Sequence, residues 1–106
     1  MNESTEPAIV LNSGQKKSLR GKGHHLDPIV FVGKEGLSPS LLKSTEVALK
    51  THELIKIKLG QNCPLERNEA ARELAQCTKS TLVQVIGRIV LLYRPNPDLP
   101  IEKRAL

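Results

Sequence analysis

IVFVGKEGLSP, residues 29–39, is the stretch of sequence that decides the fold. The run Ile29–Val32 is β-branched and apolar on both faces, which predicts a short, buried central strand. Ser38 followed by Pro39 indicates the start of a helix, because a serine side chain caps free backbone N–H groups and proline fits the first helical position. The loop between them, residues 33–36, therefore joins a strand directly to a helix.

A first helix is expected upstream of this stretch. It begins after Asn12, whose side chain can cap the backbone, and Gln15 follows three positions later as in a capping box. Leu19 and Leu26 fall on one side of this helix, with Gly23 beside them. The cationic residues share a different arc, about 100° wide, which contains Lys16, Lys17, Arg20 and His24. The pattern predicts a helix with a cationic face and a thin apolar seam.

Downstream of the stretch, helices and strands alternate. The expected elements are a helix to about residue 51, a strand over 53–59 with Lys56 and Lys58 on its outer face, a helix over 64–77, and strands over 82–86 and 89–93 joined by Gly87-Arg88. The order α-β-α-β-α-β-β predicts one α+β domain, in which helices pack against a single sheet.

The composition limits the functions that such a domain can have. The chain has 106 residues, a formal net charge of +5, one phenylalanine and one tyrosine. Between residues 16 and 34 the cations are opposed by Asp27 alone, and this asymmetry favours a polyanionic partner. Phe31 is expected to be buried in the central strand, so binding of a nucleic acid should depend on phosphate and shape rather than on base stacking.

The ends of the chain differ in composition from the middle. We expect residues 1–10 to form a flexible leader, 11–95 the folded domain, and 96–106 a proline-rich tail with neither a helix nor a central strand. No apolar run reaches the length of a membrane helix, the start of the chain lacks the layout of a secretory signal, and there are two cysteines. A cytoplasmic protein with no membrane contact is expected.

Catalytic and metal-binding patterns are weak in this sequence. His24 and His25 point 100° apart on a helix, so with Asp27 they do not form a metal-ligand set. Cys77 falls on an apolar helix face, where a small buried hydrophobe is expected. Neither a nucleophile elbow nor an acidic constellation is present. We therefore expect no metal, no cofactor, no small-molecule substrate and no enzymatic activity.

The loop at residues 33–36 is the sharpest local feature, and two interpretations of it are open. Glycines on both sides of Lys34 and Glu35 would let a phosphate approach the backbone closely near a helix N-terminus. Alternatively, Gly36 simply supplies a positive φ in a strand-to-helix turn. The spacing is neither that of a P-loop nor that of a dinucleotide fingerprint. The cationic face of the first helix could flank a nucleic-acid strand, or it could be an ordinary solvated face.

Five segments of the sequence, taken in chain order, resemble the CRM-domain family, the YhbY-like RNA-binding proteins. Together they cover about residues 11–95. Each segment alone is a weak signal, but all five in the family's order are specific. The segments are Arg20-Gly21 with His24-His25-Leu26 and Pro28; Val32-Gly33-Lys34-Glu35-Gly36-Leu37; His52-Glu53-Leu54-Ile55-Lys56-Ile57-Lys58; Leu82-Val83-Gln84-Val85-Ile86-Gly87-Arg88; and Leu92-Tyr93-Arg94-Pro95.

The resemblance implies both a fold and a function. The fold is a mixed four-stranded sheet packed with three helices, similar to the C-terminal domain of translation initiation factor three. The function is binding of RNA, such as pre-rRNA in precursors of the large ribosomal subunit, to assist ribosome assembly as a monomer. The alternative is a ribosome-associated protein–protein adaptor that uses a strand edge or the Lys56/Lys58 face. The expected RNA-binding residues are Gly33, Lys34, Glu35, Gly36, Lys16, Lys17, Arg20, Lys22 and His24.

Overall fold

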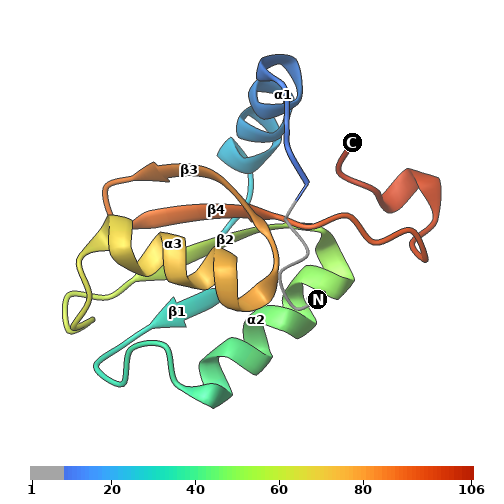
Figure 1. The fold of residues 1–106 in the computed structure, drawn as a ribbon. Coiled ribbons are helices and arrows are strands. Elements are labelled where there is room, and N and C mark those ends of the chain that lie inside the picture. The colour runs from blue at the N-terminus through green and yellow to red at the C-terminus, as the bar shows by residue number, and fades with distance from the viewer. Residues whose placement is uncertain (1–8) are drawn as a thin grey trace, which may run out of the picture.

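The computed structural model describes residues 9–106, and its four strands form one mixed sheet (Figure 1). The strand order is β1 (Val30–Val32), β2 (Leu54–Leu59), β4 (Ile89–Tyr93) and β3 (Thr81–Ile86). β1 runs parallel to β2, whereas β4 is antiparallel to both of its neighbours. The expected α+β fold, with a mixed four-stranded sheet and three helices, is confirmed.

Each helix begins where a side chain accepts hydrogen bonds from its first turn. The helices are α1 (Ser13–His24), α2 (Pro39–His52) and α3 (Arg67–Thr78). Asn12 and Gln15 form the expected capping box, and Ser38 caps α2 as predicted. α3 begins later than expected, because the Glu66 carboxylate accepts the free N–H groups of its first turn. Within residues 9–106 no helix has the length and apolar character needed to cross a membrane.

The sheet separates two apolar clusters. Figure 1 shows α1 on the side of the sheet opposite to α2 and α3. The larger cluster lies under α2 and α3, and its buried residues are Val30, Val32, Leu49, Ile55, Ile57, Leu59, Ala70, Ala71, Leu74, Val90 and Leu92. The smaller cluster lies under α1 and consists of Leu11, Leu19, Leu54, Val83, Leu91, Tyr93 and Ala105.

β1 is an edge strand, so the prediction that Ile29–Val32 is a buried central strand is wrong. Val30 and Val32 are buried under the helices, but Phe31 is 63% exposed and Ile29 is 47% exposed. β1 pairs with β2 alone, and α1 packs mainly over β2 and β3. An apolar side chain therefore lies uncovered on this face of the sheet.

Two further expectations about burial are corrected. Cys77 is exposed, and Thr78 is buried in its place with its hydroxyl donating to the Leu74 carbonyl at 2.7 Å. The hydrogen bond satisfies the hydroxyl, so a threonine can occupy the apolar side of the helix. Leu26 is 38% exposed rather than part of the α1 seam, because α1 ends at His24.

The segment after β4 packs back onto the domain. The buried carboxylate of Glu53 accepts the backbone N–H groups of Asn96 and Ala105, and the Ala105 side chain is buried in the smaller cluster. A 3-10 turn over Ile101–Lys103 lies in a stretch where neither a helix nor a central strand was expected. A leader was expected over residues 1–10, and its first eight residues lie outside the part of the chain that the structure describes.

Candidate nucleic-acid interface

The two glycines of the loop at 33–36 have different roles. The Gly36 N–H donates to the Gly33 carbonyl at 3.0 Å, which closes a tight turn with Lys34 and Glu35 exposed at its tip. Gly36 has a φ of +64°, and a Cβ there would lie 3.3 Å from Cγ of Pro64. Gly36 thus meets a conformational need of the turn. Gly33 has no such need, since a Cβ at Gly33 would find no atom within 4 Å.

Three loops meet at the same end of the sheet, on the left in Figure 1, and we call them the loop rim: residues 33–38, 60–66 and 87–88. Hydrogen bonds from two guanidinium groups tie the loop at 87–88 to the loop at 60–66 and to the start of α3. Arg88 donates to the Gly60 carbonyl at 3.0 Å, and Arg67 donates to the Gly87 carbonyl at 3.3 Å. Arg88 in the rim and Arg67, the first residue of α3 directly after it, therefore add two cations to Lys34. These arginines were not among the predicted site residues, because they are far from the loop in sequence.

Two acidic groups also lie on the loop rim, Glu35 at the tip of the turn and Glu66 directly before α3. Glu66 accepts the backbone N–H of Asn68 at 3.0 Å and that of Glu69 at 3.1 Å. The hydrogen bond from Asn68 is the largest cause that lowers the pKa of the Glu66 carboxyl below its usual value. This carboxylate is used as the cap of α3 and stays ionised at neutral pH.

α1 presents most of the predicted cations toward solvent. Lys17, Arg20 and His24 are exposed and Lys16 is half-buried. The helix packs on the sheet through Leu19 and Gly23, where a Cβ would lie 2.7 Å from both methyl carbons of Leu91. The missing side chain at Gly23 thus lets α1 pack closely on Leu91 of β4. Arg20 and His24 form one wall of a groove of about 400 Å³, whose other lining residues are Gly23, Lys56, Gln84, Ile86, Ile89 and Leu91.

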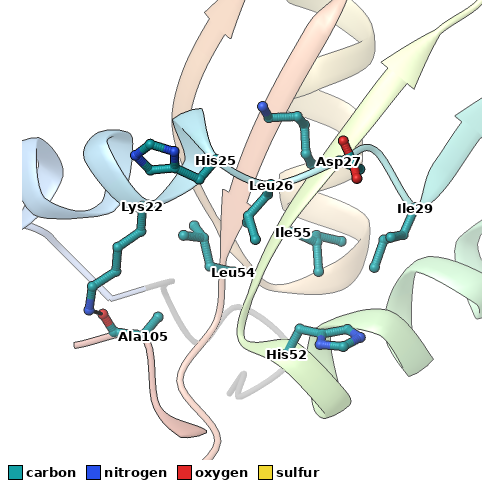
Figure 2. Close-up of a pocket in the computed structure, with 10 residues that line it drawn as sticks. Lys22, His25, Leu26, Asp27, Ile29, His52, Leu54, Ile55 and Ala105 are labelled. Atoms are coloured by element: carbon teal, nitrogen blue, oxygen red, sulfur yellow. Dashed lines mark hydrogen bonds between the residues drawn. The ribbon is translucent and has the colours of Figure 1, made fainter.

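Lys22 lies on the other side of the α1 seam. Its ammonium group donates to the Ala105 carbonyl beside a second pocket of about 490 Å³, shown in Figure 2. His25, Asp27 and His52 also line this pocket. No group of three or more potential metal ligands converges among residues 9–106. Lys22 therefore ties α1 to the segment around Ala105 and is separated from the cations of the predicted arc.

The sheet itself connects the basic side of α1 to the loop rim. Lys56 and Lys58 project from β2 on the side opposite to Ile55 and Ile57, and with Phe31, Ile86 and Ile89 they form what we call the open sheet face. No acidic residue occurs on α1 or on any of the four strands. The one ion pair within residues 9–106 joins Arg94 to Glu46, so no carboxylate neutralises these lysines there. The alternation in β2 indicated the basic face, but not its position between helix and loop.

Comparisons with known proteins agree with this architecture. The family model of the CRS1 / YhbY (CRM) domain matches residues 11–94. The chain is 40% identical over 89 residues to the Bacillus subtilis protein named "Probable RNA-binding protein YqeI", covering 84% of this chain and 93% of that one. It is 42% identical over 89 residues to "Probable RNA-binding protein PA4753" of Pseudomonas aeruginosa, covering 84% and 86%.

A solved structure shows the same fold. It is the solution structure of a hypothetical Staphylococcus aureus protein, described as a candidate RNA-binding protein. The match has a TM-score of 0.73 and 36% sequence identity, and it covers 86% of this chain and 95% of that one. With the family model spanning the whole sheet and all three helices, the chain belongs to the CRS1 / YhbY (CRM) domain family.

Proposed function

We propose that this protein binds RNA through a continuous cationic surface that runs from α1 across the open sheet face to the loop rim. The observation that carries the proposal is the sign of the charges: every charged side chain on α1 and on the four strands is cationic. The cations of α1 and the sheet attract the phosphate backbone and orient it without reading its sequence, and the acidic groups along this surface are Glu35 and Glu66 on the loop rim. The names of the relatives support RNA as the polyanion.

The loop and the helix have separate tasks in this proposal. Lys34 at the tip of the turn and Lys58 on the sheet hold phosphates by charge, while the uncovered backbone at Gly33 allows a close approach. Arg20 and His24, which line the groove on the α1 side, contact the RNA strand. Lys22 contributes less than the other cations, because its ammonium group already donates to Ala105.

The experiment is a salt titration of RNA affinity, followed by fluorescence anisotropy. If about five phosphates are neutralised, the plot of log K against log salt should have a slope of about −3.5 to −4.5. Lys34→Ala and Lys58→Ala should each make the slope less steep by about 0.7–0.9. Lys43→Ala is the matched control, since Lys43 is exposed on α2, on the other side of the sheet. A slope near zero, or equal losses with Lys43→Ala, would refute the electrostatic interface.

The RNA we propose is a precursor of the large ribosomal subunit, bound in the cytoplasm to assist its assembly, as the family resemblance implies. Crosslinking in cells followed by sequencing of the bound RNA tests this assignment. Enrichment of pre-rRNA over tRNA and mRNA is the expected result. An even distribution over tRNA and mRNA would overturn the ribosomal role while leaving RNA binding itself intact.

The second candidate function is that of a protein–protein adaptor on the ribosome. The position of β1 at the sheet edge favours it, because an edge strand carries unpaired backbone groups that can add a strand from a partner. Binding only to assembled ribosomal particles would support the adaptor. Binding to naked rRNA fragments at moderate salt supports direct RNA binding.

A further inference from the structure

Phe31 is a large apolar side chain on the open sheet face. Its neighbours Val30 and Val32 point to the other side and are buried, whereas Phe31 is 63% exposed. A buried aromatic ring contributes strongly to the free energy of folding, whereas the exposed ring of Phe31 contributes little. A ring that the domain leaves uncovered beside cations is available to a ligand.

The residues next to Phe31 follow from the strand register. Phe31 is level with Lys58 on β2, Lys58 is opposite Ile89 on β4, and Ile89 is opposite Ile86 on β3. Neighbouring strands lie about 4.8 Å apart, so the ammonium-bearing chain of Lys58 lies directly beside the ring. An aromatic ring with a lysine next to it thus stands at the edge of a row that contains no acid.

Phe31 is also close to the loop rim. Val32 alone separates it from Gly33, and Lys34 follows Gly33. Three residues of extended chain span at most about 11 Å, so the Cα atoms of Phe31 and Lys34 lie within that distance. A polyanion held by both Lys34 and Lys58 would therefore pass close to the Phe31 side chain.

We propose that Phe31 is a stacking platform for an unpaired base of RNA, whose flanking phosphates are held by Lys58 and Lys34. The inference rests on the proposed RNA-binding function and names the part of the RNA that is recognised. Charge complementarity selects this occupant: an apolar protein surface would leave the two lysines without partners, whereas single-stranded nucleic acid supplies both π-faces and phosphates. The protein should then prefer unpaired segments of RNA to continuous duplex.

The test measures the affinity of Phe31 variants for a fluorescein-labelled oligouridine and for a duplex RNA of the same length. Phe31→Ala should weaken binding of the oligouridine about 5- to 150-fold. The slope against log salt should stay the same, because no phosphate contact is removed. Duplex affinity should change less than twofold. Phe31→Tyr, which keeps an aromatic ring, should bind nearly as well as the wild type, and Phe31→Leu, which does not, should resemble Phe31→Ala.

Val47→Ala is the matched control, because Val47 is 57% exposed on α2 and loses a similar kind of surface. Wild-type affinity in Phe31→Ala overturns the stacking proposal, as does wild-type affinity in Phe31→Leu, which would show an apolar contact without stacking. These outcomes leave the cationic interface standing. If the affinity of the wild type for RNA does not fall with rising salt concentration, the proposed function fails instead.

Ultraviolet crosslinking of the wild type to oligouridine is a second experiment, and it needs no variant. A crosslink at residues 29–34 supports the stacking proposal, and crosslinks confined to α1 refute it.

Discussion

Gly33 and Gly36 bracket the same turn, but their substitution should have opposite effects on folding. Gly36→Ala places a side chain at a φ of +64°, which costs about 1–2 kcal/mol for an L-residue. The lower entropy of the unfolded chain offsets about 0.4–1 kcal/mol of this. The net loss is at most about 1.6 kcal/mol, which corresponds to a fall in Tm of up to about 7 °C for a domain of this size.

Gly33→Ala should leave the fold intact and weaken RNA binding. A Cβ at Gly33 meets no atom within 4 Å and no positive φ is involved, so Tm should stay the same or rise slightly. If a phosphate of the RNA lies against the Gly33 backbone, the new methyl group pushes that phosphate away. The loss of a hydrogen bond between the backbone and the charged phosphate should lower RNA affinity about tenfold or more. Calorimetry and anisotropy measure the two quantities. Wild-type affinity in a folded Gly33→Ala protein would refute close approach at this glycine.

Three other substitutions or titrations test the packing. Gly23→Ala should destabilise the domain by about 1 kcal/mol, because a new Cβ lies 2.7 Å from the Leu91 methyl carbons. In Gly21→Ala the new Cβ meets nothing within 4 Å, so this substitution should stabilise α1 by up to about 1 kcal/mol. Urea denaturation of the two variants compares their free energies of unfolding. Glu53→Gln should lower the free energy of unfolding by about 1.5–3 kcal/mol, since an amide donor replaces an oxygen that faces a backbone N–H, and an unchanged denaturation midpoint would contradict this role. Burial, and then the Glu53 carboxylate, raise the pKa of Tyr93, so ultraviolet titration of this single tyrosine should give a midpoint above 10. The stability from the neutral phenol is fully present below pH 10 and is lost as the pH rises beyond it; a midpoint at or below 10 would contradict the buried environment.

Local signals in the sequence predicted the secondary structure well. The capping pairs at Asn12 and Ser38 identify helix starts through hydrogen bonds between residues three apart, so no tertiary information is needed. Alternation in β2 assigned Ile57 and Lys58 to opposite faces for the same reason. These features depend on neighbours in the chain, and the structure confirms them.

Strand order and burial depended on contacts that the sequence does not contain. Ile29–Val32 has the composition of a central strand, yet parallel pairing to β2 alone leaves it at the edge. Cys77 lies at the margin of the apolar side of α3, where the hydrogen-bonded Thr78 is buried instead. At β1 no helix covers the face that carries Phe31, and at α3 a hydrogen-bonded threonine takes the buried position expected for the cysteine.

The candidate site was predicted as two separate pieces. The loop and the basic helix were recognised from local pattern, and their RNA-binding role stays a prediction. The structure adds Lys56 and Lys58 between them and places Lys22 on the far side of α1. Register across the sheet and the return of the chain near residue 105 determine these positions, and neither can be read from the spacing of residues along the chain.

The cluster under α1 has a consequence for the order in which the fold assembles. It joins Leu11 and Leu19 to Ala105, and the bond from Lys22 to Ala105 closes a separation of 83 positions. Contacts between residues so far apart in the sequence form late in folding, because a long loop must close first. The layer of α2 and α3 is built from segments that lie nearer to one another in the sequence. α1, which also contains two exposed glycines, should dock last and show the fastest amide hydrogen exchange of the three helices. A protein that holds RNA with this helix carries part of its binding surface on the segment that opens first.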